Sequence, residues 1–215
     1  GLGDVYKRQG KDGAEEWKGV PNGLPVTELS LPEYDNNHNS CIWGYMWGYD
    51  WNSAEKGDNI SKPKTDADFT PLGLMNYSEV CFLKAEAALR GWQGAGDAKT
   101  NYENGIRASF EEMRANAPKD SYSKSNDDKY ISEGNVAWNN ADSFEAKLEK
   151  IITQKWIGIY PNSEEAWAEF RRTGYPKLNP VKQSLEPTIN PKNGEFIKKL
   201  RYVDNELSNN NCLLY

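Results

Sequence analysis

Five aromatic residues alternate with non-aromatic ones in one short stretch of this 215-residue sequence. On an extended backbone successive side chains point to opposite faces, so all five rings would share one face. Flat, rigid rings stack on the apolar faces of sugars at low entropic cost, while neighbouring polar groups satisfy the hydroxyls. The run is therefore a candidate carbohydrate contact. The alternative is that the rings are core residues that pack a loop onto helices. The five residues are Trp43, Tyr45, Trp47, Tyr49 and Trp51.

Charged residues offer two further candidate chemistries. Arg171 and Arg172 follow an acidic segment. They would either form ion pairs near a helix C-terminus or bind a carboxylate or an acidic sugar through a planar guanidinium fork. Glu79 and Glu86 lie seven residues apart, which would suit the two carboxylates of a glycosidase. We expect Glu79 to cap a helix instead, and Glu86 to lie on a solvated face beside Lys84. The sequence therefore favours a binding protein over an enzyme.

Nothing in the sequence predicts a metal or cofactor site. The single histidine, His38, lies in a polar, turn-like run without a metal-binding partner at ligand spacing. Cys41, Cys81 and Cys212 have no regular spacing, so they define neither a zinc site nor a disulfide framework. Cys81 sits among apolar residues and is expected to be a buried thiol. No catalytic triad or phosphate-binding loop is present.

Composition excludes two broad classes. The net charge is −6 and the longest basic runs are pairs, which argues against nucleic-acid binding. No apolar segment reaches the roughly 18 residues that a membrane-spanning helix requires. Apolar residues make up only 37% of the chain and aromatic residues 12%, so Trp, Tyr and Ala are expected to supply much of the core.

The periodicity of apolar residues predicts an all-α fold with two helix pairs. Residues 10–75 have turn signals but no helical period, and we expect irregular structure there. The first pair spans residues 76–116. A capping box, Asn76–Glu79, opens a helix from Tyr77 to Arg90, and Asp97 caps a second helix from Ala98 to Asn116. The expected buried stripe of the first helix is Val80, Leu83, Ala87 and the stem of Arg90, widened by Cys81, Ala85, Ala88 and Leu89. That of the second helix is Tyr102, Ile106, Ser109, Phe110 and Met113.

The second pair spans residues 142–176, after a polar segment, 117–137, that reads as a surface loop. A capping box, Asp142–Glu145, opens a helix whose buried stripe is Phe144, Leu148, Ile151, Ile152 and Trp156. Asn162 opens a short helix that Gly174 and Pro176 terminate. Trp156 and Trp167 are expected to pack these two helices together. Four prolines from Pro176 onward keep the remaining tail irregular.

Four blocks in this order resemble the C-terminal part of the SusD/RagB family. The strongest are the helix Tyr77–Trp92 and the block Gln154–Pro176, which contains Gln154-Lys155-Trp156, Glu165-Ala166-Trp167 and Arg171-Arg172-Thr173-Gly174-Tyr175-Pro176. Residues 101–110 and 200–207 match less specifically. The likeness covers residues 19–207. We assign residues 10–207 to one SusD-like region, which also includes the short segment before the first matched residue. Residues 1–9 and 208–215 are expected to be artefactual or disordered termini.

The resemblance implies a tetratricopeptide-like helical protein, here truncated, with long irregular loops. Such proteins are lipid-anchored on the outer membrane, where they bind an oligosaccharide or a peptide and deliver it to a TonB-dependent, SusC-like transporter. The lipid anchor would lie in an N-terminal part that this chain lacks. The alternative from another class is a helical-repeat interaction scaffold without a small ligand. Because helices of the family are missing, we expect the isolated chain to be poorly soluble.

Overall fold

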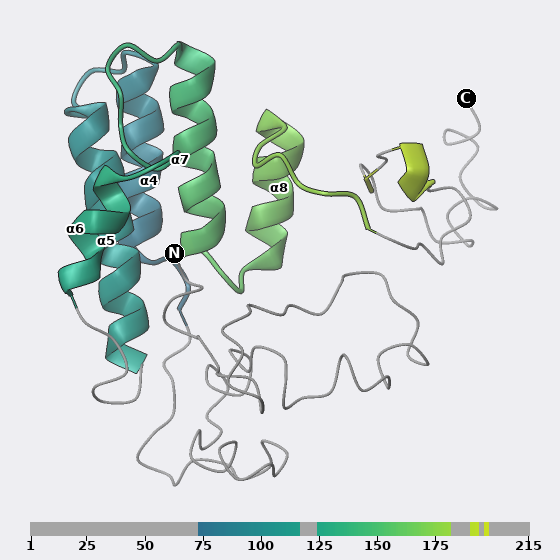
Figure 1. The fold of residues 1–215 in the computed structure, drawn as a ribbon, viewed down its shortest axis with the longest axis horizontal. Helices are drawn as coiled ribbons and strands as arrows, with labels where there is room; N and C mark the ends of the chain where they lie inside the picture. Colours follow the sequence, from purple (N-terminus) through teal and green to yellow (C-terminus); the bar gives the residue numbers. More distant parts are fainter. Residues whose placement is uncertain (1–72, 117–123, 182–189, 194–195, 198–215) are drawn as a thin grey trace, which may run out of the picture. The chain divides into compact units, whose positions relative to one another are not determined.

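The computed structural model describes residues 73–116, 124–181, 190–193 and 196–197 (Figure 1). These residues form helices and no strand, which confirms the all-α prediction. The helices are α4 (Tyr77–Leu89), α5 (Ala98–Asn116), α6 (Ser125–Ser132), α7 (Phe144–Gly158) and α8 (Ser163–Thr173), with a short 3-10 turn, η3, at Pro191–Asn193. The chain divides into two compact units, and all five α-helices belong to the same unit.

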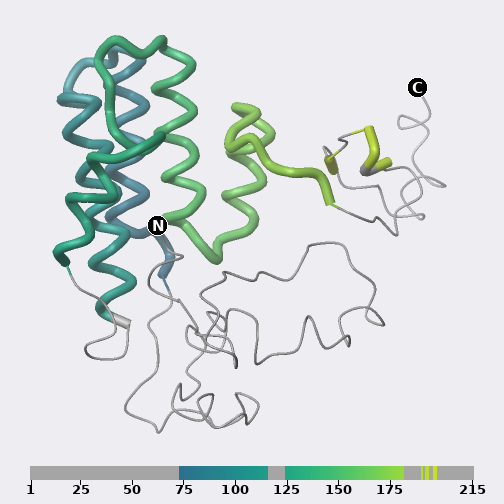
Figure 2. Tube along the Cα trace, in the orientation of Figure 1, coloured from purple at the N-terminus to yellow at the C-terminus, as the bar shows by residue number. Residues whose placement is uncertain are grey.

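Three helices form the centre of this unit. α4 packs against both α5 and α7, and α5 also contacts α7. α6 lies against α5, whereas α8 lies beside α7 on the other side of the bundle (Figures 1 and 2). The two predicted helix pairs, α4–α5 and α7–α8, are therefore present.

The start of α4 lies where the sequence predicts it, but the predicted capping box is wrong. Asn76 is the N-cap residue, and its side chain makes no capping hydrogen bond. The Ser78 amide and hydroxyl instead donate to the Glu112 carboxylate of α5, at 3.1 Å and 2.9 Å. A carboxylate beside the positive end of the helix dipole is favourable. The group that caps α4 therefore comes from a residue 34 positions away.

The buried face of α4 also differs from the predicted stripe. Its apolar members are Cys81, Phe82 and Ala85, and its polar members are Ser78, Glu79 and Glu86. Leu83, predicted to be buried, is 38% exposed. Half of the buried face is polar because partners on other helices satisfy these groups. The prediction is thus confirmed at Cys81 and Ala85 and wrong at Leu83, because a stripe chosen for apolar residues alone leaves out the buried polar residues.

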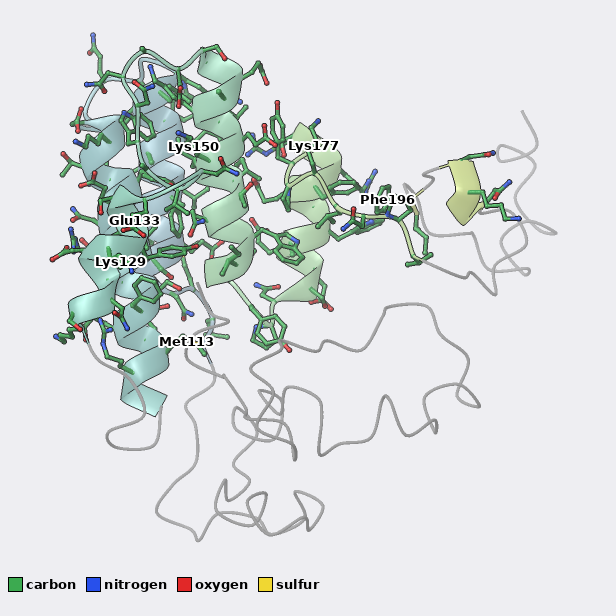
Figure 3. All side chains as sticks on the ribbon, in the orientation of Figure 1. Met113, Lys129, Glu133, Lys150, Lys177 and Phe196 are labelled. Atoms are coloured by element: carbon green, nitrogen blue, oxygen red, sulfur yellow. The ribbon has the colours of Figure 1, made fainter. Side chains whose placement is uncertain are left out.

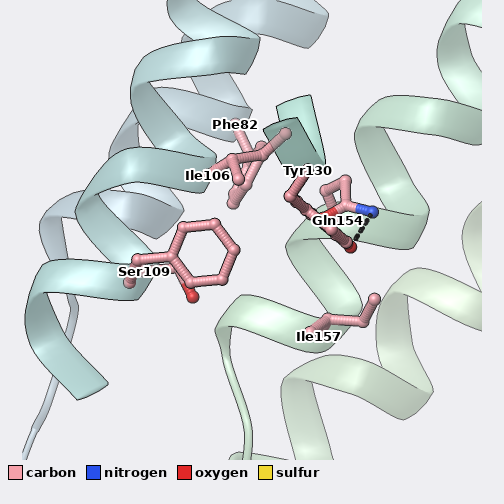
Figure 4. A pocket seen from close by; sticks show the side chains of 7 residues that line it. Phe82, Ile106, Ser109, Tyr130, Gln154 and Ile157 are labelled. Carbon is pink, nitrogen blue, oxygen red and sulfur yellow. Dashed lines mark hydrogen bonds between the residues drawn. The ribbon is translucent and has the colours of Figure 1, made fainter. Parts of the chain in front are cut away.

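The main core lies between α4, α5, α6 and α7. Its buried members are Phe82, Ala85, Tyr102, Ile106, Phe110, Ile131 and Ile151. The predicted α5 stripe is confirmed at Tyr102, Ile106, Ser109 and Phe110, while Met113 is half-buried. A small cavity of about 10 Å³ remains beside Phe82 and Ile106 (Figure 4). Tyr130 and Gln154, which are hydrogen-bonded to each other at 3.0–3.1 Å, lie on its polar side.

The segment expected to be a surface loop contains α6, so that prediction is wrong for residues 125–132. Ile131 enters the main core, and Asp127 is buried. Two guanidinium nitrogens of Arg114 bind the Asp127 carboxylate at 3.0 Å and 2.6 Å. Ile131, the ion pairs Arg114–Asp127 and Arg107–Asp128, and the contact between the Tyr130 and Phe110 rings attach this helix to α5. Such a short polar helix carries almost no periodic apolar signal.

The second helix pair follows the prediction with one shift. Ser143, rather than Asp142, caps α7, and its side chain accepts a hydrogen bond from the Ala146 amide. Asp142 instead pairs with Lys150 at 2.7 Å. Leu148, Ile151 and Ile152 are buried as predicted, but the ends of the stripe, Phe144 and Trp156, are 40% and 36% exposed.

Both termini of α8 confirm the sequence prediction. The Asn162 side chain accepts a hydrogen bond from the Glu165 amide at 3.2 Å. Gly174 ends the helix in the left-handed conformation, with φ of 76°, and its amide donates to the Phe170 carbonyl at 2.8 Å. Glycine adopts this conformation without steric cost, which explains its position here.

Candidate functional site

The aromatic run predicted from the sequence lies outside the described residues. Trp43, Tyr45, Trp47, Tyr49 and Trp51 all precede residue 73, so the structure places none of them. His38, Cys41 and Cys212 likewise lie outside the described ranges. Cys81 is a free, buried thiol, as predicted. In the described part of the chain, no group of His, Cys, Asp and Glu side chains has a geometry suited to a metal ion.

The two neighbouring arginines have different surroundings. The Arg172 guanidinium binds the Glu86 carboxylate with two hydrogen bonds of 2.7 Å and the Glu169 carboxylate with a third of 2.7 Å. Its planar fork thus joins α8 to α4, as the ion-pairing interpretation predicts. The Arg171 guanidinium lies 4.6 Å from the centroid of the Trp167 ring, a cation–π geometry. Trp167 is half-buried and Trp156 is partly exposed, and neither belongs to the buried clusters of the described core.

Lys155 is the buried centre of the contacts between α7 and α8. It is only 1% exposed. Its ammonium lies 2.7 Å from Glu165, 3.4 Å from Glu169 and 3.8 Å from Glu79. Three carboxylates from two helices compensate the desolvation of this cation. Lys155 lies four residues after Ile151, so the helical period alone places it on the buried face of α7. Its charge, however, gives no apolar signal in the sequence.

The same contacts shift the pKa values of the two α4 carboxylates in opposite directions. Burial raises the pKa of Glu79, and the Glu165 and Glu169 carboxylates add to this, while Lys155 acts against it. Burial also tends to raise the pKa of Glu86, but hydrogen bonds from Arg172 and Arg90 outweigh it, so the pKa lies below its ordinary value. Neither carboxylate has its predicted role, because Glu79 does not cap α4 and Glu86 is buried rather than solvated. Both instead join helices.

A polar groove lies on the opposite side of the unit, along α5, α6 and the segment after α6. We call it the α5–α6 groove. Its volume is about 490 Å³. Lys99, Glu103 and Arg107 line it from one face of α5, four residues apart from one another. The remaining lining residues are Asp128, Lys129, Ile131, Ser132, Ala137 and Trp138.

The only indole among these lining residues, that of Trp138, is held in place from two sides. Its Nε1 donates a hydrogen bond of 3.0 Å to the Asn140 side chain. Its ring packs on that of Tyr102, with centroids 5.4 Å apart. The Tyr102 hydroxyl in turn donates to the Val136 carbonyl at 2.8 Å. The aromatic surface of the groove is therefore fixed to the core of the bundle.

In the described part of the chain, no helix combines the length and apolar composition needed to cross a membrane.

Comparison with known proteins identifies the fold. A family model described as SusD-like, Susd and RagB outer membrane lipoprotein, matches residues 29–214. A chitin-binding SusD homologue from Flavobacterium johnsoniae is 29% identical, with a TM-score of 0.64, over 98% of this chain and 42% of its own. A SusD-like protein from Bacteroides thetaiotaomicron is 33% identical, with a TM-score of 0.53, over 72% of this chain and 34% of its own.

A second SusD homologue from Bacteroides thetaiotaomicron is 28% identical, with a TM-score of 0.62, over 98% of this chain and 42% of its own. No similar protein was found among curated protein sequences. This chain thus spans less than half the length of the solved relatives that it matches. The family match extends over most of the sequence, and it includes both helix pairs whose termini and ion pairs are described above. The chain belongs to the SusD-like family of SusD/RagB outer-membrane lipoproteins.

Proposed function

We propose that this chain acts in nutrient binding at the bacterial cell surface and that its ligand is an oligosaccharide. The observation that carries the proposal is the similarity, over 98% of the chain, to a SusD homologue that binds chitin. The family description, an outer membrane lipoprotein, supports a location at the outer membrane through a lipid anchor. Delivery of the ligand to a TonB-dependent transporter is a further part of the proposal, and the resemblance in sequence supports it. The proposed role is binding rather than catalysis.

Within this proposal, the aromatic run at residues 43–51 contacts the ligand and the helices support it. The described helices suit a supporting role, because buried ion pairs and a continuous core join α4, α5, α7 and α8. A rigid support lowers the entropic cost of ordering a binding surface. The rings of Trp47 and Trp51 would then stack on sugar units.

A double substitution tests this ligand contact. We expect Trp47→Ala with Trp51→Ala to weaken binding of chito-oligosaccharides, or of the best ligand from a glycan array, at least ten-fold, or ~1.4 kcal/mol. Isothermal titration calorimetry of the full chain measures the change. Trp92→Ala is the matched control, since Trp92 is a strongly exposed tryptophan outside the run. Unchanged affinity in a folded double variant would contradict the ligand contact.

The same glycan array separates the alternatives. A peptide-binding relative would give no glycan signal but would bind a peptide library. An interaction scaffold would bind neither, while still co-purifying with a transporter. Turnover of the bound sugar, detected by chromatography of the ligand after incubation, would contradict the assignment as a binding protein.

A further inference from the structure

We propose that the α5–α6 groove is a second saccharide site, which takes a sugar unit carrying an anionic group such as a carboxylate. This proposal goes beyond the function proposed above, because the groove contains none of residues 43–51 and lies wholly within the described helical unit. It rests on the shape of the groove, its charges and the fixed indole of Trp138.

The shape of the groove suits one or two sugar units. Its volume of about 490 Å³ lies within the range of small-molecule sites, roughly 300–1,000 Å³. Ile131, which is buried, and Ala137 contribute apolar surface. Trp138 adds an indole, the side chain with the largest flat apolar surface. A pyranose ring presents C–H groups that match such a surface, while its hydroxyls point outward.

The charges of the groove suit both hydroxyls and one anion. Lys99 pairs with Glu103 at 3.7 Å, and Arg107 pairs with Asp128 at 2.5 Å. Each pair offers donors and acceptors that are already oriented toward each other, and these can satisfy sugar hydroxyls. The groove thus has three cationic and two anionic side chains.

Of the three cations that line the groove, Lys129 is the one outside the two ion pairs just described. Within the described part of the chain, no carboxylate lies within ion-pair distance of its ammonium. Lys129 lies on α6, on the side of the bundle away from α8 (Figure 3). Its charge is therefore available to a bound anion, and the net positive charge of the groove favours acidic over neutral sugars.

The groove is formed before any ligand arrives. Asn140 and Tyr102 fix the Trp138 ring, as described above. The Lys150 ammonium donates to the Ala137 carbonyl at 2.6 Å and to Asp142 at 2.7 Å, which holds the segment carrying Trp138 against α7. Such a site loses little conformational entropy on binding.

The test compares acidic saccharides with their neutral counterparts on the full chain. The acidic ligands are trigalacturonate and sialyllactose, and the neutral ones are galactotriose and lactose. Titration is followed by NMR at the tryptophan indole N–H signals, with the Trp138 signal assigned from Trp138→Phe. We expect an acidic saccharide to shift the Trp138 signal, and its affinity to fall as salt increases.

Two variants connect the binding to the groove. We expect Lys129→Gln to weaken acidic saccharides at least three-fold and to leave neutral ones unchanged, while Lys84→Gln, on the exposed face of α4, changes neither. We expect Trp138→Ala to reduce binding at least ten-fold. If Trp138→Ala does not fold, the Lys129→Gln result still decides.

The proposal is overturned if none of the four saccharides shifts the Trp138 signal. It is also overturned if acidic saccharides bind the unaltered chain no more tightly than neutral ones do, or if they bind the Lys129→Gln variant as tightly as they bind the unaltered chain. The Trp47→Ala, Trp51→Ala variant distinguishes this site from the ligand contact proposed at residues 43–51. Retention of the Trp138 shift in that variant supports a separate site, and its loss would contradict one.

Discussion

At the scale of single residues, Lys155 shows how a charged side chain becomes part of the core. It is buried among three carboxylates, and its removal would leave these groups without their shared cation. Loss of one partner from a buried ion pair is more costly than replacement of the whole set by apolar residues. The polar residues on the buried face of α4 are explained in the same way, because each of them has a partner on a neighbouring helix.

Gly105 gives a prediction at the same scale. A Cβ atom at this position would lie 2.7–2.8 Å from three ring atoms of Phe82, which is enclosed in the core. Overpacking of this kind costs about 1–3 kcal/mol, against a gain in helix propensity of about 1 kcal/mol. We therefore expect Gly105→Ala to lower the free energy of unfolding by up to about 2 kcal/mol. Urea denaturation of the full chain measures it.

Asn104 provides the control for this substitution. It is the preceding residue of α5 and it is exposed. We expect Asn104→Ala to change the free energy of unfolding by no more than about 0.5 kcal/mol. An increase in stability for Gly105→Ala would show that Phe82 can move aside, and the account of the close packing would then be wrong.

At the scale of elements, the start of α4 depends on another helix. We expect Asn76→Ala to cost less than about 0.5 kcal/mol, because the Asn76 side chain makes no capping bond. We expect Glu112→Ala to cost on the order of 1.5–3 kcal/mol, because it removes two hydrogen bonds from Ser78 to a charged group. Thermal or urea denaturation compares the two variants. If Asn76→Ala lowers the free energy of unfolding as much as Glu112→Ala does, or more, then Asn76 rather than Glu112 caps α4.

The junction of α4 and α8 predicts a dependence on pH. The pKa of Glu86 is lower in the folded chain than its ordinary value of 4.5. Its contribution to stability is thus present above pH 4.5 and is lost as pH falls through the lowered pKa. We expect Glu86→Gln to cost on the order of 1.5–3 kcal/mol at pH 7. The cost should shrink toward pH 3, as measured by urea denaturation at several pH values.

Glu79 is the matched control, because its pKa is shifted the other way. A raised pKa in the folded chain means that its contribution is present below pH 4.5 and is lost as pH rises through the raised pKa. The change in stability caused by Glu79→Gln should therefore become more favourable between pH 4 and pH 7. If both variants show the same trend with pH, the opposite shifts of the two carboxylates are refuted.

At the scale of the whole molecule, exposed apolar side chains predict self-association. Leu74 and Met75 are 85% and 62% exposed, next to the strongly exposed Tyr77 at the start of α4. Adjacent apolar groups of this kind favour association between proteins. We expect light scattering of the full chain to show a mass that rises with concentration. Leu74→Ser with Met75→Ser should reduce this rise, whereas a monodisperse sample of the unaltered chain at all concentrations would contradict the prediction.

The sequence predicted those parts of the fold that local chemistry controls. The caps at Asp97 and Asn162 and the terminal Gly174 act within a few residues, and all three lie where they were expected. α6 was missed because contacts with α5, chiefly the ion pairs of Asp127 and Asp128 and the packing of Ile131 and Tyr130, hold it rather than a periodic apolar stripe of its own. The α5–α6 groove was also missed, because α5, α6 and the segment carrying Trp138 line it together and no single stretch of sequence shows it.

The amino-acid sequence by itself determined the all-α class, the two helix pairs and the family, because helix caps, apolar periods and motif order are local properties. Tertiary structure decided which faces are buried and what the charged residues do. Glu112 caps a helix 34 residues away, and Arg172 binds a glutamate 86 residues away. Burial of a charge depends on whether a partner reaches it in space. That partner is set by helix packing and not by neighbouring positions in the chain.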